Sequence, residues 1–356
     1  MPLQPHLKQI IEGRTTLPRE EARALMQQIL SGQLSDIEIA ALLGALAARG
    51  ETSAEIAGFV DAMRAAATNL PLNQAEQLQL VDTCGTGGDS SGTFNISTAA
   101  ALVATAAGAT VAKHGNRAVT SQTGSADVLE ALGISVDLTP DKAATALRTN
   151  RFTFLHAPSL HPAMKAVMPV RRALGFRTIF NILGPLTNPA GASSQVMGVY
   201  SPHLVPLVAE AMALLGTRHA FVVHGNIEVA SAPASKASIT TKSGLDELSI
   251  AGPSQLAEVH NGIVTLSTIT PEDVGLQRAP LEALRGGDAH TNAAILTAIF
   301  SGEQGPCRDI VLLNAAAVLV AADLAPDLQN GIALAAKAID TGAVTNLMAK
   351  LRIKEI

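Results

Sequence analysis

The residue types best suited to chemistry occur in a glycine-rich segment followed by small polar residues. The segment reads Asp82-Thr83-Cys84-Gly85-Thr86-Gly87-Gly88-Asp89, and Thr93, Asn95, Ser97 and Thr98 follow at the expected start of a helix. Glycines at a strand end let the backbone approach a ligand closely, and the free N–H groups of a helix start suit phosphate. The spacing fits neither a nucleotide P-loop nor a dinucleotide fingerprint. Taken alone, a tight turn with a helix cap explains the segment about as well as a phosphate site.

A second candidate segment, Lys113-His114-Gly115-Asn116-Arg117, ends the next apolar run, so it is expected to face the same crevice. Lys113 offers a point charge for phosphate, while His114 and Asn116 offer directional hydrogen bonds for a planar polar ligand. Alone, these residues could form a surface turn, but their position beside the glycine-rich segment favours binding. Ser125 opens a further helix, where it suits phosphate or simple capping.

Basic residues and paired carboxylates supply two further candidates. Beyond His161, the run Val170-Arg171-Arg172 leads into Gly175 to Pro189, and an arginine held there could bind a carboxylate through two parallel hydrogen bonds. The alternative, a salt-bridged helix face, fits Arg172 and Arg177 better than it fits all three arginines. The adjacent Asp246 and Glu247 suit Mg²⁺ together with substrate phosphates, although such pairs are common on surfaces.

The elements that must position these residues change character along the chain. The first seventy residues read as helices, with Pro18 near one start and capping-box patterns at Ser35 and Thr52. From Leu78 onward, short apolar runs alternate with helical segments, which predicts parallel strands with ligand loops at their carboxyl ends. The expected strands are LQLVDTCG, TVAKHG, ISVDL, FTFLHA, QVMGVY and AFVVHG. The tail from Asn292 is expected to be mainly helical.

Composition excludes several classes of protein. The 356 residues carry 25 Lys and Arg against 30 Asp and Glu, a net charge of −5 without a basic block, so the chain is not built to hold nucleic acid by bulk charge. Two cysteines match neither a disulfide framework nor a metal spacing, which points to a reducing compartment such as the cytoplasm. The N-terminus does not read as a secretory signal. The long uncharged run from Ser90 to Ala112 is interpreted as a buried helix and strand and not as a membrane span.

Taken together, these segments resemble the anthranilate phosphoribosyltransferase family. In chain order they are GTGGD with TFNIST, KHGNR with TGSADVLEALG, HPAMK with PVRRALGFRTIFNILGPLTNP, GLDELS, and GGDAHTNAAIL with GPCRDIVLLNAAA. The resemblance runs from about residue 10 to the C-terminus. GTGGD alone would be a modest signal, whereas KHGNR combined with the long arginine-containing segment is highly specific.

The resemblance implies Mg²⁺-dependent transfer of a phosphoribosyl group from phosphoribosyl pyrophosphate to the amine of anthranilate, the second step of tryptophan biosynthesis from chorismate. It also implies an α/β fold in which a small N-terminal all-helical domain is hinged to a large domain with a mostly parallel central sheet flanked by helices. We expect the helical domain at residues 1–72, with 165–185 packing on it as the hinge region, and the α/β domain at 73–356. Members usually form homodimers through their helical domains.

Site residues carry over from the family by matching positions. For phosphoribosyl pyrophosphate they are Gly85, Gly88, Asp89, Thr93, Asn95, Ser97, Thr98, Lys113 and Ser125. For anthranilate they are Gly85, His114, Asn116, His161 and Arg171, and for Mg²⁺ they are Ser97, Asp246 and Glu247. Lys113 and Arg171 are the expected catalytic residues, because one stabilises the departing pyrophosphate and the other orients the acceptor carboxylate.

One departure from the family pattern is the stretch from Asn226 to Ser243, which separates the strand ending in His-Gly from GLDELS. We expect a loop or exposed hairpin that leaves Asp246 and Glu247 in place, because long loops cost little additional closure entropy. Two rival functions share this architecture. A pyrimidine nucleoside phosphorylase is disfavoured by the KHGNR and VRR segments, and a non-catalytic nucleic-acid-binding relative is disfavoured by the net charge.

Overall fold

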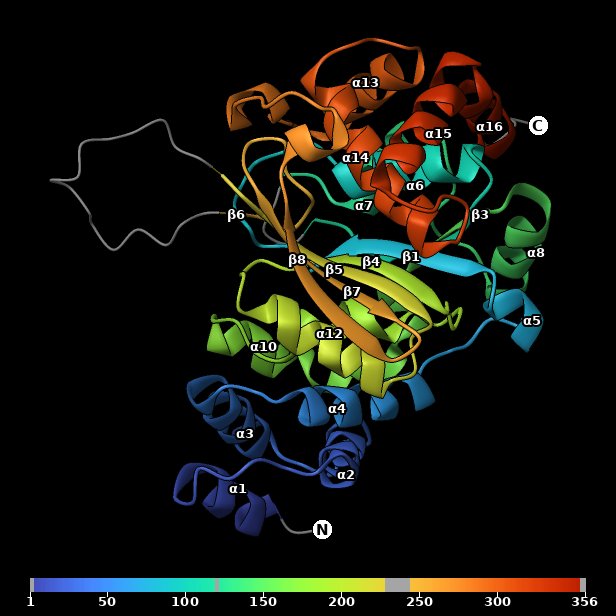
Figure 1. Cartoon of the computed structure of the whole chain (residues 1–356). Helices are drawn as coiled ribbons and strands as arrows, with labels where there is room; N and C mark the ends of the chain where they lie inside the picture. The colour runs from blue at the N-terminus through green and yellow to red at the C-terminus, as the bar shows by residue number, and fades with distance from the viewer. Residues whose placement is uncertain (1–2, 119–121, 228–243, 353–356) are drawn as a thin grey trace, which may run out of the picture.

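The computed structural model describes residues 3–118, 122–227 and 244–352. Its N-terminal part is a bundle of helices, seen in blue at the bottom of Figure 1. The capping boxes predicted at Ser35 and Thr52 are confirmed, since both hydroxyls accept a hydrogen bond from the backbone three residues on. The helices are α1 (Leu3–Ile11), α2 (Arg19–Leu30), α3 (Asp36–Arg49) and α4 (Ser53–Ala65), with the short α5 (Gln74–Gln77) after them.

An eight-stranded mixed sheet forms the centre of the molecule, with strand order β3-β2-β1-β4-β5-β7-β8 and β6 paired to β5. The pairings from β3 to β5 are parallel, whereas β6, β7 and β8 add antiparallel pairings at one side. This confirms the predicted fold class. The strands are β1 (Leu80–Gly85), β2 (Thr110–Gly115), β3 (Phe152–His156), β4 (Ser194–Gly198), β5 (His219–Asn226), β6 (Gly244–Leu245), β7 (Ser254–His260) and β8 (Ile263–Ile269).

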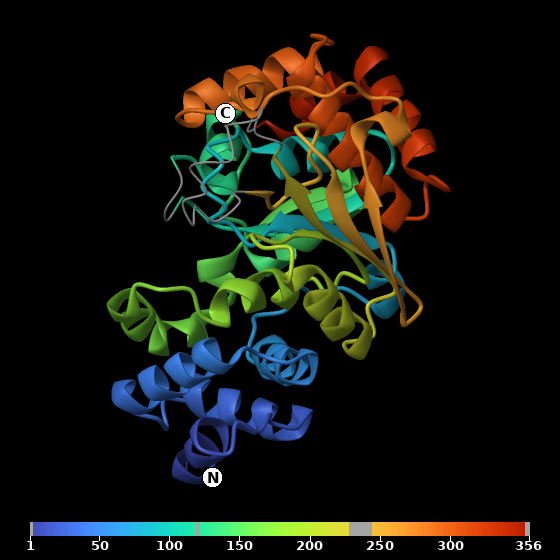
Figure 2. The same cartoon turned by 60° about the vertical axis from the view of Figure 1, so that its left-hand side comes forward.

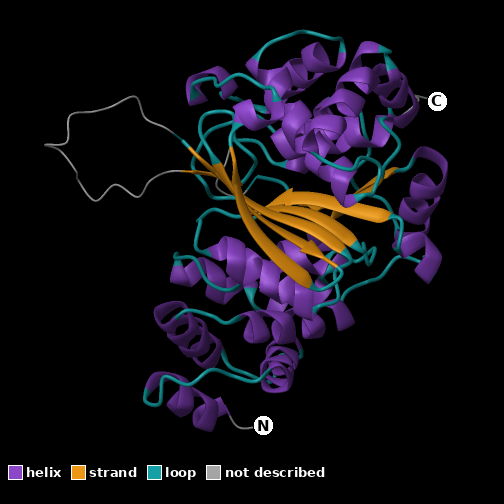
Figure 3. Ribbon diagram, in the orientation of Figure 1, coloured by secondary structure: helices purple, strands orange, loops and turns teal. Residues whose placement is uncertain are grey.

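Helices cover both faces of this sheet, as Figure 3 shows. One face carries α6 (Ile96–Ala106) and the C-terminal helices, of which α14 packs on both α6 and α15. The C-terminal helices are α13 (Ala289–Phe300), α14 (Pro306–Ala321), α15 (Leu328–Asp340) and α16 (Ala343–Leu351). The other face carries α12 (Leu204–Leu214), which lies between the sheet and α4. Connecting elements are α7 (Ser125–Ala131), α8 (Pro140–Asn150), α9 (Ala157–Leu160), η1 (Pro162–Ala166), α10 (Met168–Leu174), α11 (Phe180–Leu183), η2 (Gly184–Thr187), η4 (Pro271–Val274) and η5 (Leu281–Leu284).

The helical bundle shares a hydrophobic core with one face of the sheet. Alternate residues of β5 divide between two cores, because successive strand side chains point to opposite faces. Phe221 and Val223 join the core under the C-terminal helices, while Ala220 and Val222 join the core that includes α1 to α4. Helices α10 and α12 complete this second core, and Figure 2 shows the green helices between the blue bundle and the sheet. The bundle is therefore attached through packed apolar side chains, beyond the single covalent link at residues 66–79.

One local prediction was wrong, and one hairpin was not predicted. The segment ISVDL (134–138) is not a strand but an extended connection with one isolated bridge from Ile134 to Arg352, and it buries Ile134 and Val136. Its apolar alternation serves burial beneath neighbouring helices and not sheet pairing. The β7–β8 hairpin was missed, although its turn at Asn261-Gly262 carries a sequence signal. Both turn residues have positive φ, 51° and 83°, as a two-residue hairpin turn requires.

Glu55 provides a test of how the bundle is stabilised. Its carboxylate is fully buried and accepts hydrogen bonds from the backbone of Leu17 (2.8 Å) and Thr52 (2.9 Å) and from the Arg49 guanidinium (2.5 Å). We expect Glu55→Ala to lower the free energy of unfolding by about 3 kcal/mol, because Arg49 and two N–H groups lose their partner. Urea unfolding with amide exchange along α4 measures this loss. Glu38→Ala, at the exposed capping box, is the matched control and should lose clearly less; equal losses would contradict the argument.

Candidate active site

The candidate site lies where three neighbouring strands, β1, β4 and β5, reach their carboxyl ends. Each strand carries a glycine there, and the segment Asp246-Glu247 passes directly over all three. A Cβ atom on Gly85 would overlap Asp246 Oδ2, and one on Gly198 would overlap the Asp246 carbonyl oxygen. A Cβ atom on Gly225 would lie only 2.6 Å from the Glu247 carbonyl oxygen. The approach is possible only because these positions have no side chain.

The glycine-rich loop after β1 folds against the same carboxylates. The Gly87 N–H donates to Asp246 Oδ2 over 2.6 Å, and the Asp246 N–H donates weakly to Asp89 Oδ2 over 3.4 Å. Gly87 and Gly88 have φ of 72° and 73°, a conformation that favours glycine. The loop therefore brings Gly85, Gly87 and Asp89 beside Asp246.

Glu247 and Lys113 meet at the start of α6. Glu247 Oε1 accepts from the Ser97 N–H over 3.0 Å, and Lys113 Nζ donates to Ser97 Oγ over 3.2 Å and to the Thr83 carbonyl over 2.6 Å. Lys113 is 1% exposed. The helix start, the lysine and the carboxylate thus converge on Ser97, with each held by a different element.

Burial and mutual repulsion shift the protonation of this cluster. Burial first, and then the neighbouring charges of Asp89 and Glu247, raise the pKa of Asp246 well above its usual value. Burial raises the pKa of Glu247 to about 7 despite the opposing charge of Lys113, and burial lowers the pKa of Lys113. Closely packed carboxylates with raised pKa values are stabilised by a bound cation, which supplies the charge that solvent cannot. The donor set therefore fits a divalent, oxygen-seeking ion such as Mg²⁺.

Two buried histidines lie beside this cluster. The rings of His114 and His161 are 5.1 Å apart between centroids, and each has an Nε2 atom without a hydrogen-bond partner among the described residues. The His114 N–H donates to Asp82 Oδ1 over 3.1 Å, which anchors this end of β2 to β1. Burial, followed by the nearby His161, lowers the pKa of His114 from 6.5 to about 3, so the ring is neutral. Two neutral imidazoles with free polar atoms can hydrogen-bond a planar ligand.

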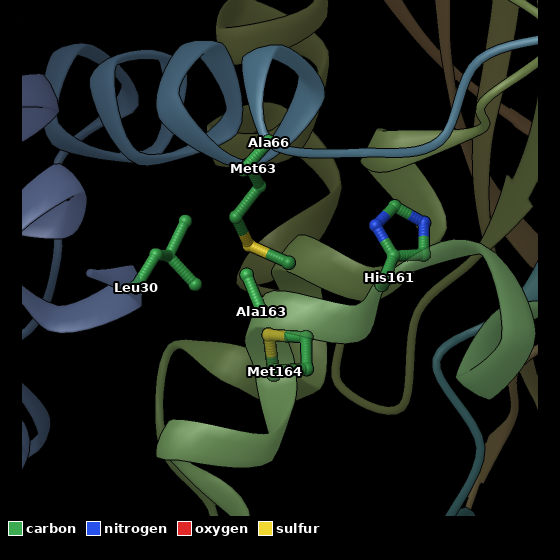
Figure 4. A pocket seen from close by; sticks show the side chains of 6 residues that line it. All are labelled: Leu30, Met63, Ala66, His161, Ala163 and Met164. Atoms are coloured by element: carbon green, nitrogen blue, oxygen red, sulfur yellow. The ribbon is translucent and has the colours of Figure 1, made fainter. Parts of the chain in front are cut away.

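His161 also borders the contact between the helical bundle and the α/β part. Figure 4 shows its ring at one side of a narrow pocket, across which Leu30 and Met63 of the bundle approach Ala163 and Met164. Any change in the angle between the bundle and the sheet would therefore alter the surroundings of His161. The His161 end of the candidate site is therefore adjacent to this interdomain contact.

Arg171 lies on α10 and has no ion-pair partner within the described residues. Its guanidinium stacks over the Phe180 ring, 5.4 Å from the centroid, and burial lowers its pKa. The predicted salt-bridged helix face for Arg172 and Arg177 was wrong. Arg172 only reaches the Met168 carbonyl (3.4 Å). Arg177 lies outside α10, stacks on Tyr200 at 4.1 Å and donates to the Gly88 carbonyl, so it supports the glycine-rich loop.

The remaining predicted residues make contacts within their own loops and neighbouring segments. Asn95 Nδ2 donates to the Thr123 carbonyl (3.2 Å), and Thr98 Oγ1 is buried without a hydrogen-bond partner in the described residues. Thr93 forms an isolated bridge with Arg285, and Ser125 begins α7 beside Gly115 at the end of β2. Asn116 is exposed, and its side-chain oxygen accepts from the Arg117 N–H (2.8 Å). All of them lie on the loops and helix starts that follow β1 and β2.

Sequence reasoning missed two asparagines that position the site. Asn314, in the middle of α14, accepts from the Leu248 N–H (3.0 Å) and donates to the Leu248 carbonyl (2.9 Å), which holds the segment after Glu247. Asn292 donates to Asn95 Oδ1 over 2.9 Å. A buried asparagine within a strongly apolar helix was the available signal for Asn314, because a buried amide requires partners.

The insertion does not displace the acidic pair. Asn226 pairs with Gly244 and Gly225 with Leu245 in antiparallel register, so the chain returns to β5 beside the point where it left. Asp246 and Glu247 then follow directly over the strand ends. Most of the predicted loop or hairpin, residues 228–243, lies outside the described residues.

Comparison with known families identifies the class of protein. Residues 77–236 and 228–345 match the family described as glycosyl transferase family, a/b domain, and residues 4–67 match its helical bundle domain. The two parts of the first match meet within the segment that contains the insertion. The fold and the site thus define a glycosyltransferase built from a helical bundle and an α/β domain.

Individual relatives narrow this class. The anthranilate phosphoribosyltransferase of Symbiobacterium thermophilum is 48% identical over 346 residues, 97% of this chain and 96% of that protein. The crystal structure of the Thermus thermophilus anthranilate phosphoribosyltransferase aligns with a TM-score of 0.86 at 44% identity and covers 97% of each chain. The solved structure of the Saccharomyces cerevisiae anthranilate phosphoribosyltransferase in complex with PRPP and Mg aligns with a TM-score of 0.84 at 26% identity. The alignment covers 98% of this chain and 96% of that chain. The chain belongs to the anthranilate phosphoribosyltransferase family, which confirms the resemblance found in the sequence.

The buried, neutral His114 predicts a particular loss of stability in acid. Its folded pKa, about 3, lies below its unfolded value near 6.5, so between these pH values the unfolded chain binds a proton that the folded chain rejects. Stability should therefore fall as pH decreases below 6.5. We expect His114→Asn to make the fall between pH 6 and pH 5 shallower by about 1 kcal/mol, measured by urea unfolding without ligands.

Exposed His203 provides the control, because His203→Asn removes a histidine that is not buried. This variant should keep the acid slope of the parent protein. If His114→Asn also kept it, the folded protein would have to accommodate a charged His114, contrary to the burial argument.

Proposed function

We propose that this chain transfers the 5-phosphoribosyl group of phosphoribosyl pyrophosphate to the amine of anthranilate, giving N-(5-phosphoribosyl)anthranilate and pyrophosphate. The observation that carries the proposal is the meeting of the glycine-rich loop, Ser97, Lys113 and the Asp246-Glu247 segment at adjoining strand ends. Such a site combines anion-binding N–H groups with a cation site, as a pyrophosphate donor requires. The names of the relatives support the same reaction.

For the metal, we propose that Asp246, Glu247 and Ser97 hold Mg²⁺. Their contacts support this set, because Glu247 accepts from the Ser97 N–H and Asp246 lies against the glycine-rich loop. A yeast relative has been solved with PRPP and Mg. When bound, Mg²⁺ would neutralise negative charge on the pyrophosphate that leaves.

The donor site extends from the metal residues onto the loops after β1 and β2. Lys113 Nζ, already within 3.2 Å of Ser97 Oγ, would stabilise the departing pyrophosphate as a buried positive charge. The starts of α6 and α7, where no N-cap side chain accepts a hydrogen bond, would present N–H groups to phosphate. The full proposed set is Gly85, Gly88, Asp89, Thr93, Asn95, Ser97, Thr98, Lys113 and Ser125.

The acceptor site is proposed at Gly85, His114, Asn116, His161 and Arg171. The two neutral histidines supply unpartnered ring nitrogens, and Arg171 supplies a half-buried guanidinium without an ion-pair partner in the described chain. Such an arginine binds a carboxylate through two parallel hydrogen bonds. An aromatic amine is unprotonated at neutral pH, so positioning the nucleophile suffices and no general base is required.

The assembly and the domain division remain proposals of the same kind. We propose a homodimer through the helical bundle, supported by Ile11 and Ile37, which are 59% and 82% exposed there. For the domain division, we propose that residues 1–72 move relative to 73–356 about the segment 165–185, whose helix α10 packs on α3.

The described residues contain no helix that could cross a membrane. We propose a cytoplasmic location, because both cysteines are free thiols, as a reducing compartment would maintain them.

The reaction is tested by measuring pyrophosphate release from phosphoribosyl pyrophosphate, with and without anthranilate and with and without Mg²⁺. Release that requires all three components supports the proposal. A well-folded protein that releases no pyrophosphate under any of these conditions would refute it, and nucleic-acid binding would be the next activity to assay.

The acidic pair should control turnover. We expect Asp246→Asn combined with Glu247→Gln to lower kcat by at least about a hundredfold, because removing charge at a preorganised electrostatic site is costly in the transition state. Steady-state kinetics across a Mg²⁺ titration measures the effect. The control is Glu20→Gln with Glu21→Gln, an adjacent acidic pair in the first turn of α2. Unchanged Mg²⁺ dependence in the first variant would reject these ligands.

Arg171 should act mainly on the acceptor. We expect Arg171→Ala to raise the KM for anthranilate by roughly tenfold to a hundredfold, the loss of one charge-assisted interaction, with a smaller effect on the KM for phosphoribosyl pyrophosphate. Arg171→Lys should restore little, because an ammonium group cannot form the two parallel bonds. The neighbouring exposed Arg172→Ala is the matched control. Normal anthranilate kinetics in Arg171→Ala would remove this residue from the acceptor site.

A further inference from the structure

We propose that His219, Glu258 and His260 form a binding site for a divalent transition metal such as Zn²⁺, at the end of the sheet opposite the candidate active site. His219 begins β5 and lies directly across the antiparallel ladder from His260, the last residue of β7. Glu258 precedes His260 by two residues and therefore shares its face of the sheet. The potential ligand atoms of all three residues lie within 4.8 Å of one another.

The contacts of His219 favour a cation at this position. Its Nδ1 lies 3.0 Å from Asp323 Oδ1, and its Nε2 lies 2.9 Å from Glu258 Oε1. A neutral imidazole donates from one nitrogen only, so the lone pair of the other would face a carboxylate oxygen. Either a second proton or a metal ion must therefore separate Nε2 from Glu258. With Asp323 holding Nδ1, Nε2 has the orientation that carboxylate-bound histidines use toward a metal.

The ligand geometry is close to what a tetrahedral ion requires. Ligand atoms around Zn²⁺ lie about 3.3 Å apart, so Nε2 and Oε1 must separate slightly while the His260 nitrogen moves closer. The rings of His219 and His260 stack at 4.5 Å with an angle of 19°, so the His260 ring must rotate before both rings direct a nitrogen at one ion. His260 is exposed and the Glu258 side chain is 37% exposed, so both can adjust and an ion can enter from solvent. Two imidazoles and one carboxylate favour Zn²⁺, Co²⁺ or Ni²⁺ over Mg²⁺.

The site is separate from the proposed reaction, and its argument does not depend on that proposal. His219 and Gly225 are six residues apart on β5, which places roughly 20 Å between the two sites. A metal here would join β5 and β7 directly. It would also join the loop after α14, because Asp323 holds both His219 and Arg218. Its expected effect is therefore on the stability of this end of the sheet.

The test uses the full chain, treated with a chelator and then titrated with Co²⁺, whose visible d–d absorption reports tetrahedral nitrogen and oxygen ligands. We expect one equivalent to bind with this absorption. His260→Ala and Glu258→Gln should each weaken binding by at least about tenfold, the usual effect of losing a metal-site residue. His203→Ala, which removes an exposed histidine elsewhere, and Asp246→Asn with Glu247→Gln should leave it unchanged.

Thermal unfolding supplies a second measurement that does not use absorption. Zn²⁺ should raise the Tm of the parent protein and not that of His260→Ala, because an ion that binds only the folded state stabilises it. Equal Tm values in chelator show that His260→Ala is folded, and Glu258→Gln repeats the test independently. The proposal fails if no saturable binding occurs, if both variants bind Co²⁺ normally, or if only the Asp246 and Glu247 substitutions abolish binding.

Discussion

The close passage of the Asp246-Glu247 backbone over three glycine-ended strands is the constraint on which the rest of the site depends. Gly85, Gly198 and Gly225 lie on the adjoining strands β1, β4 and β5, and a methyl group at any of them would overlap this segment. Without that contact, the carboxylates could not reach the glycine-rich loop. The sheet therefore supports this segment, and the missing side chains allow its close approach to the strand ends.

The same passage explains the electrostatics of the cluster. It forces the carboxylates of Asp246 and Glu247 into a buried position near Asp89, and burial and repulsion together raise their pKa values. Lys113 opposes this only in part, because it is itself desolvated. An apo site of this kind is unfavourable for the folded protein, and a cation removes the disadvantage. The positive charge of a bound cation would therefore stabilise this site.

The two buried histidines beside this cluster have a different electrostatic environment. His114 and His161 are kept neutral by burial, and their unpartnered nitrogens lie near the contact between the helical bundle and the α/β part. The bundle and the sheet share a core through α10 and α12, so the position of the bundle and the shape of this region are coupled. In contrast, the histidine cluster at the other end of β5 lies on the paired strands β5 and β7, and its His260 is exposed.

The sequence by itself determined the helical start, the alternation that produces a mostly parallel sheet, and the placing of Lys113, His114 and the glycine-rich loop at strand ends. These features depend on local periodicity, caps and glycines, and parallel topology brings strand ends together without further information. Local patterns were insufficient in two places. The segment ISVDL alternates apolar and polar residues but does not pair as a strand, and the hairpin turn at Asn261-Gly262 was not predicted.

Only the tertiary structure decided how distant segments meet. Several contacts of the site join residues far apart in the chain. Asp246 lies against Gly87, Asn314 holds Leu248, and Arg177 supports Gly88. Asp323 likewise approaches His219 from a distant segment. Contacts of this kind depend on how helices pack and where chains cross, and one-dimensional patterns record the residue types but not their distances or their burial.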